Sequence, residues 1–190
     1  MIKLNLGCGY NKKENFINVD SDRNVEPDLV HDLETTWPWE KDSVSEVYFE
    51  HSLDRIGKTV EQYYFVMREL YRVCKNGAKV FITVPHPRHD NFLKDPEIRR
   101  AIIPQSLLLF NLQHNLQQIG KGIFETHLGL QLGVNFQIVT QKYFLEEDIH
   151  KALTEKKVSE QQVQEMLRFQ NNVCREIEIE IEVVKTPEKN

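Results

Sequence analysis

Residues 3–20 read KLNLGCGYNKKENFINVD, in which two short apolar runs lie on either side of a glycine turn. Residues 3–6 and 16–19 are predicted strands, and Gly7 and Gly9 follow the first one. Only residues 10–15 separate Gly9 from the second run, which is room for about one and a half helical turns. The stretch therefore predicts the start of an open α/β sheet with a shortened first helix.

The glycine turn is a candidate ligand site. Ligands of open α/β sheets bind at the carboxyl ends of strands, and glycines let a ligand come close to the backbone. Asp20 stands at the end of the second predicted strand. Its carboxylate can accept hydrogen bonds from both hydroxyls of a ribose, so the pattern indicates a nucleoside site.

The same stretch disfavours a dinucleotide. The G-x-G-x-x-G fingerprint requires a third glycine where this chain has Lys12, and its pyrophosphate needs a full helix N-terminus. A nucleoside without phosphates fits better, and S-adenosylmethionine is such a cofactor, with an amino-acid tail that the backbone near the glycines can hold. A nicotinamide oxidoreductase is the disfavoured alternative.

Composition predicts one cytoplasmic domain. The chain has 190 residues, of which 40% are hydrophobic and 28% charged, as in globular proteins. No apolar run approaches the ~20 residues of a membrane helix, and we see no secretory signal. Three widely spaced cysteines favour a reducing compartment and no metal site. The net charge of −5 disfavours nucleic-acid partners.

Further elements follow from hydrophobic periodicity. Residues 29–30, 44–49, 78–84, 134–139 and 176–185 are predicted strands, residues 58–75 a helix capped by Asn76-Gly77, and residues 96–119 mostly helical. Continuous apolar runs favour a parallel sheet covered on both faces, whereas the alternating EIEIEIEVVK favours a final antiparallel strand. Residues 146–171 are predicted to form an amphipathic helix or helix pair.

We predict a single domain over residues 1–186, with a helical insertion at about 146–171 between the last two strands and a tail at 187–190. The charged insertion is most simply a solvated cover; a partner surface or homodimer contact is the alternative.

Five segments together resemble the class I S-adenosylmethionine-dependent methyltransferases, and most closely the small bacterial and phage-type members similar to methyltransferase type 11. They lie in the family's order over roughly the first half of the chain. The segments are LNLGCG (4–9), INVD (17–20), HDLE (31–34), WPWEKDSVSEVYFEHSLDRI (37–56) and RELYRVCKNGAKVFITVP (68–85).

The resemblance implies a Rossmann-like sheet in the order 3-2-1-4-5-7-6, with strand 7 antiparallel and helices on both faces. It implies S-adenosylmethionine as cofactor, with Asp20 on the ribose and Asp32 with the Leu33 amide at the adenine. The residues that it places at the cofactor are Leu6, Gly7, Cys8, Gly9, Asp20, Asp32, Leu33 and Glu50.

One departure from the family leaves the activity open. Leu53-Asp54-Arg55 stands where the family has Leu-Glu-His. If that histidine serves the reaction, this chain is a non-catalytic S-adenosylmethionine-binding protein, either regulatory or a pseudoenzyme. We otherwise expect a methyltransferase that acts on a small-molecule or sugar-like acceptor.

Histidines are the candidate bases, because their side chains titrate near neutral pH. HPRHDN (86–91) follows a predicted strand beside the same cleft, so His86 and His89 are the first candidates. His51, just past the fourth strand, is the second. A solvated loop at 86–91 and a backbone-bonded His51 are the structural alternatives.

Overall fold

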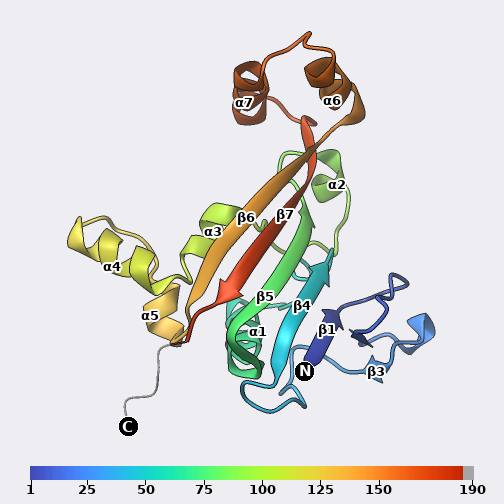
Figure 1. Cartoon of the computed structure of the whole chain (residues 1–190), viewed down its shortest axis with the longest axis vertical. Helices are drawn as coiled ribbons and strands as arrows, with labels where there is room; N and C mark the ends of the chain where they lie inside the picture. The colour runs from blue at the N-terminus through green and yellow to red at the C-terminus, as the bar shows by residue number, and fades with distance from the viewer. Residues whose placement is uncertain (186–190) are drawn as a thin grey trace.

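The computed structural model describes residues 1–185 and contains one seven-stranded sheet (Figure 1). All seven predicted strands are present, with shifted ends. They are β1 (Ile2–Leu6), β2 (Ile17–Asp20), β3 (Leu29–Val30), β4 (Val44–Glu50), β5 (Cys74–Pro85), β6 (Phe136–Leu145) and β7 (Cys174–Val183).

The strand order is β3-β2-β1-β4-β5-β7-β6, which confirms the predicted topology. The pairs from β3 to β5 are all parallel. β7 runs antiparallel to both β5 and β6. The carboxyl ends of β1, β2 and β4 therefore meet at one edge of the sheet.

The described helices follow β2, β4, β5 and β6. The 3-10 turn η1 (Arg23–Val25) and α1 (Val60–Val73) come first. After β5 lie α2 (Asp90–Leu93), α3 (Pro104–Leu108), α4 (Leu112–Gly120) and α5 (Leu128–Leu132). The predicted helix pair is confirmed as α6 (Glu147–Thr154) and α7 (Glu160–Phe169), which project together beyond one end of β6 and β7 (Figure 1). The predicted tail, residues 187–190, lies outside the described residues.

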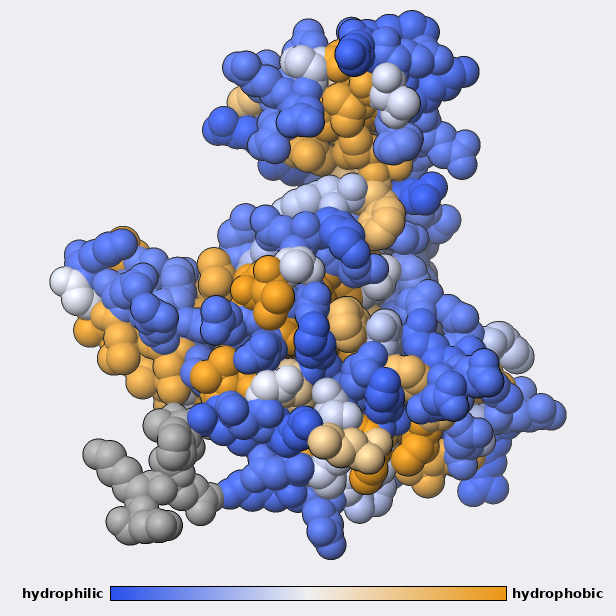
Figure 2. Space-filling view, viewed as in Figure 1, coloured by the Kyte–Doolittle hydropathy of each residue, from blue (hydrophilic) through white to orange (hydrophobic). Residues whose placement is uncertain are grey.

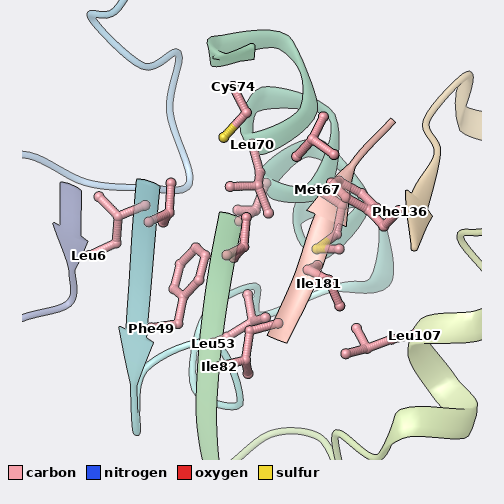
Figure 3. Close-up of a cluster of buried hydrophobic side chains, with 14 of the residues drawn as sticks. Leu6, Phe49, Leu53, Met67, Leu70, Cys74, Ile82, Leu107, Phe136 and Ile181 are labelled. Carbon is pink, nitrogen blue, oxygen red and sulfur yellow. The ribbon is translucent and has the colours of Figure 1, made fainter. Parts of the chain in front are cut away.

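One face of the sheet carries the core. Alternate residues of β4, β5 and β7, such as Phe49, Ile82 and Ile181, are buried on it. Met67 and Leu70 of α1 and Leu107 of α3 pack into the same cluster (Figure 3). Trp37 and Trp39, from the segment before β4, are buried there as well.

The opposite face, called the open face below, is less completely covered: the residues of β4 and β7 that point to it are only partly buried. Over β4 and β5 it carries Tyr48 and Phe81, stacked with ring centroids 4.6 Å apart. Lysine–glutamate pairs surround them, at 2.7 to 2.9 Å between nitrogen and oxygen. Figure 2 shows mostly hydrophilic side chains over these strands. Because apolar and charged residues alternate along these strands, the side chains of this face can stay in contact with water.

The first crossover, residues 7–16, consists of turns, which corrects the predicted shortened helix. Side chains of the flanking strands hold its backbone instead. The Asn5 side-chain amide donates to the Asn11 carbonyl oxygen at 2.9 Å, and the Asn18 side-chain oxygen accepts from the Lys13 amide at 2.7 Å. These bonds stabilise non-helical backbone, as asparagine side chains often do in loops.

Helix α1 ends earlier than predicted. Thr59 and Gln62 form a capping box at its start, but it stops at Val73, and Cys74 is already extended. Gly77, predicted as the cap, lies within β5 with φ of 74°. The β4–β5 register shifts between Val44 and Glu46, so Gly77 serves a strand irregularity instead.

Candidate cofactor-binding site

A pocket of about 780 Å³ opens at the carboxyl ends of the first four strands. Its walls come from the segments that follow β1, β2, β3 and β4. Further lining residues are Arg55, Ile56, Lys58, Glu97 and Arg99. This edge is where open α/β sheets bind ligands. Of the eight predicted cofactor residues, seven line it: Gly7, Cys8, Gly9, Asp20, Asp32, Leu33 and Glu50.

Gly7 is required by both backbone and space. Its φ is 67°, a left-handed value that favours glycine. A Cβ atom there would lie 2.5 Å from Cβ of Ser52. The Ser52 hydroxyl donates to the Leu6 carbonyl oxygen at 2.7 Å, which holds the segment after β4 against the end of β1. This hydrogen bond thus holds the carboxyl ends of β1 and β4 together at the base of the pocket.

Asp20 connects the turns after β1 and β2. Its Oδ2 accepts from the Gly9 amide at 2.8 Å, and its Oδ1 accepts from the Asp22 amide at 2.9 Å. Each carboxylate oxygen can accept about two hydrogen bonds. Asp20 therefore keeps acceptor capacity on both oxygens for a ligand in the pocket.

His51 also lines the pocket and has a strained backbone. Its φ is 51°, unusual for a residue with a side chain, and its amide donates to the Thr83 carbonyl oxygen at 2.8 Å. Its Nε2 lies 3.6 Å from Oε1 of Glu176 on β7. Strain of this kind concentrates at functional sites.

The whole fold resembles solved methyltransferases. One S-adenosylmethionine-dependent enzyme from Archaeoglobus fulgidus superposes with a TM-score of 0.61 at 17% identity, over 95% of this chain and 86% of that one. Another from Methanosarcina mazei gives 0.54 at 12%, over 96% and 92%. The chain has the class I methyltransferase fold.

The fold does not define the reaction. The [4+2]-cyclase SpnF also superposes on this chain, with a TM-score of 0.51 at 13% identity over 96% of this chain and 75% of its own. No family model and no curated protein matches the sequence. One fold often carries unrelated functions, so the residues of the site are what can indicate an activity.

The remaining predicted cofactor residues have distinct environments within this methyltransferase fold. Oδ1 of Asp32 accepts from the Glu34 amide at 2.9 Å, and the Glu50 carboxylate pairs with the Lys13 ammonium at 3.0 Å. Burial raises the pKa of the Cys8 thiol, which fits a packed residue better than a nucleophile. Leu6 is fully buried in the core and is not among the pocket-lining residues, so its contact with the cofactor stays a prediction.

The first two candidate bases, His86 and His89, are not among the pocket-lining residues. His89 is buried, and both its nitrogens are engaged: Nδ1 accepts from the Asn91 amide at 3.0 Å, and Nε2 lies 2.7 Å from Oε1 of Glu146. Nδ1 of His86 accepts from the Arg88 amide at 3.2 Å. The loop 86–91 thus anchors the start of α2 and the α6–α7 pair.

The segment that departs from the family lies beside the pocket. The guanidinium of Arg55, a lining residue, pairs with Asp95 at 2.6 Å and Glu97 at 3.1 Å. The Asp54 side chain is 1% exposed, and its carboxylate has no hydrogen-bond partner among the described residues. Burial raises the pKa of this carboxyl.

Sequence reasoning missed His31, Ser52 and Arg55 as pocket residues. Nε2 of His31 is buried with no hydrogen-bond partner in the described part of the chain, although the residue lines the pocket. A signal existed, because His31 directly precedes the predicted adenine residue Asp32. Within residues 1–185 there is no cluster of three metal-ligating side chains and no helix long and apolar enough to cross a membrane.

Proposed function

We propose that this protein binds S-adenosylmethionine and transfers its methyl group to a small-molecule acceptor. The observation that carries the proposal is Asp20, which lies at the end of β2, lines the pocket and accepts a single hydrogen bond on each carboxylate oxygen within the described residues. A ribose diol is the part of the cofactor that a carboxylate in this place would hold.

The rest of the pocket supports the same cofactor. Open backbone at Gly7 and Gly9 would admit the methionine portion, and Asp32 with Leu33 would face the adenine. His31 adds a ring nitrogen without a protein partner on the same wall. The turns of the first crossover provide no helix N-terminus for a pyrophosphate, which disfavours a dinucleotide.

Methyl transfer from a sulfonium is an in-line displacement. The acceptor forms a bond to the methyl carbon as the carbon–sulfur bond breaks, its electrons stay on sulfur, and S-adenosylhomocysteine leaves. The protein's main contribution is to place the two reactants at near-attack distance. An acceptor hydroxyl or ammonium must also lose a proton.

His51 is the best-placed base for that proton. It lines the pocket, and Oε1 of Glu176 lies 3.6 Å from its Nε2, so the carboxylate can orient the ring. His86 and His89, which the sequence favoured, are committed to the loop and to α2.

The second candidate function is non-catalytic binding of S-adenosylmethionine. It is favoured by Arg55, which stands in the family's histidine position and is held by two carboxylates. In that case the pocket would report cofactor level to a partner without turnover.

Calorimetry tests the binding step. We expect S-adenosylmethionine and S-adenosylhomocysteine to bind and NAD not to bind. Asp20→Asn is expected to weaken binding roughly 10- to 100-fold, since it removes a charged hydrogen-bond acceptor. Asp148→Asn, at an acid of α6 outside the pocket, is the control. Undiminished binding by Asp20→Asn would contradict the proposal, as would NAD binding alone.

Turnover separates the two functions. The protein is incubated with S-adenosylmethionine and pooled small metabolites, and S-adenosylhomocysteine is measured. His51→Asn is the sharpest variant, because asparagine tolerates the positive φ and removes the base. We expect it to bind the cofactor and to lose about 100-fold in rate. Cofactor binding without product from any pool supports the non-catalytic alternative.

A further inference from the structure

The segment 111–132, here called the arm, has an unusual surface. It comprises α4, α5 and their connection, and it projects from the side of the sheet (Figure 1). Five apolar side chains on it are between 44% and 104% exposed, and Figure 2 shows apolar side chains along its lower edge. They are Leu116, Ile119, Ile123, Phe124 and Leu130.

Helix α4 of the arm is inverted relative to an ordinary amphipathic helix. The one buried residue of α4 is polar: Asn115, with 0% exposure. Its side-chain amide donates to the Leu109 carbonyl oxygen at 3.0 Å, and its oxygen accepts from the Leu130 amide at 3.2 Å. The arm is therefore fixed in place by polar bonds on its inner side, while Leu116 and Ile119 face outward.

The apolar positions form a stripe. Within α4, Leu112, Leu116 and Ile119 follow one another at steps of four and three residues, and Ile123 comes shortly after the helix ends. This is the spacing with which one helix packs along another. No other described helix covers Leu116 or Ile119, because both are more than a third exposed.

Charge indicates what covers the stripe. The chain is 28% charged and has a net charge of −5, yet residues 101–141 contain only Lys121 and Glu125 among the charged types. Glu125 lies 2.8 Å from Nε2 of His114, so its charge is directed within the arm. Two acidic molecules repel each other unless they meet through a surface without charge. An uncharged face is suited to meeting its own copy.

We propose that the arm is a homodimer interface, in which the apolar stripe of one chain packs against the same stripe of a second copy. Such a two-fold contact is self-complementary. The five exposed side chains offer on the order of 500 Å² of apolar surface per chain. That is more than half of the roughly 800 Å² per partner in a standard interface, and the glutamines around them supply a polar rim.

The mass in solution tests this proposal. Sedimentation equilibrium of the full chain between about 1 and 100 µM is expected to give twice the 22.5 kDa chain mass. Phe124→Ser and Ile119→Gln are each expected to weaken the dimer about 30-fold or more, as truncation of an interface hot spot does. Unchanged circular dichroism and unfolding temperature would show that the variants fold.

A matched control exists at the opposite end of the molecule. Phe169 of α7 is 77% exposed but lies outside the arm, so Phe169→Ser is expected to leave the dimer unchanged. A wild-type chain that stays monomeric at 100 µM overturns the proposal and leaves the stripe to another partner. A dimer that resists both arm variants, or that Phe169→Ser dissociates, also overturns it.

Discussion

The two faces of the sheet are built by alternate residues of the same strands, yet their environments are opposite. Phe49, Ile82 and Ile181 point into a dry core closed by α1 and α3. Their neighbours Tyr48 and Phe81 point to the open face, among paired lysines and glutamates. The difference teaches that one face of this sheet is stabilised by apolar packing, whereas the other keeps aromatic and paired charged side chains in partial contact with water.

The largest expected effect is on the covered face. Phe49→Ala should reduce the free energy of unfolding by about 3–5 kcal/mol, because Phe49 is completely buried and the core cannot fill the cavity. Urea denaturation measures this. Phe49→Leu is the control and should cost less than about 1.5 kcal/mol. Equal losses for both variants would mean that the site tolerates no shape change, and cavity formation would not be the cause.

The second prediction concerns Asp54, a carboxyl enclosed next to the dry core. Burial raises its pKa above the ordinary 3.8, so the folded state binds its proton more readily than the unfolded state. At pH values above this raised pKa the buried, charged carboxylate therefore destabilises the folded state. This loss of stability disappears as the pH falls and the carboxylate is protonated. Asp54→Asn should therefore stabilise the protein by about 1–2 kcal/mol near pH 7.5.

Denaturation of Asp54→Asn at pH 7.5 and at pH 4 checks this sign, since the gain should shrink at the lower pH. A variant that is less stable at both values would show that Asp54 has a stabilising partner. A gain in stability combined with weaker cofactor binding would mark Asp54 as a residue kept for function at a cost in stability.

The open face should respond less. Phe81→Ala removes one half of the Tyr48–Phe81 stack, and we expect a loss of about 1 kcal/mol, as for other cross-strand aromatic pairs. Urea denaturation measures this loss in the free energy of unfolding, which can then be compared with the loss for Phe49→Ala. A loss above about 3 kcal/mol would mean that this face is buried in solution, and the contrast between the faces would fail.

The smallest effect is expected at an exposed ion pair. Lys142 and Glu178 are 2.7 Å apart, and the lysine side chain is largely exposed. Lys142→Gln should leave the midpoint of urea unfolding nearly unchanged, with any difference lost in 0.5 M salt. A clear decrease of the midpoint that persists in 0.5 M salt would show that the open face depends on its charges for folding.

Much of the fold could be predicted because each strand carries a local signal. The glycine turn, the short FINV run and the alternating EIEIEIEVV predicted β1, β2 and an antiparallel β7, and the resemblance to the family supplied their order in the sheet. The cover of the sheet could not be predicted so well. VSEVYF also alternates, but alternation within one strand does not show which residues of other strands share its faces. The strand registers are needed to see that Lys3, Lys79 and Glu180 lie on the same face.

The site was predictable where backbone geometry dictates residue type. Gly7, Gly9 and Asp20 line one pocket as expected, since a left-handed turn and a strand-end acid are readable from sequence. The choice between His51, His86 and His89 was not readable, because it depends on which loop turns toward the pocket. The acceptor and the cytoplasmic location remain predictions.

The position of β7 has a consequence for synthesis of the protein. This strand follows β6 in the sequence, but it lies between β5 and β6 in the sheet. While residues 174–183 are still inside the ribosome, β5 presents an open edge and β6 has no partner in the sheet. Until β7 has been translated and completes the sheet, the edges of β5 and β6 in a nascent chain can therefore pair with strands of other chains.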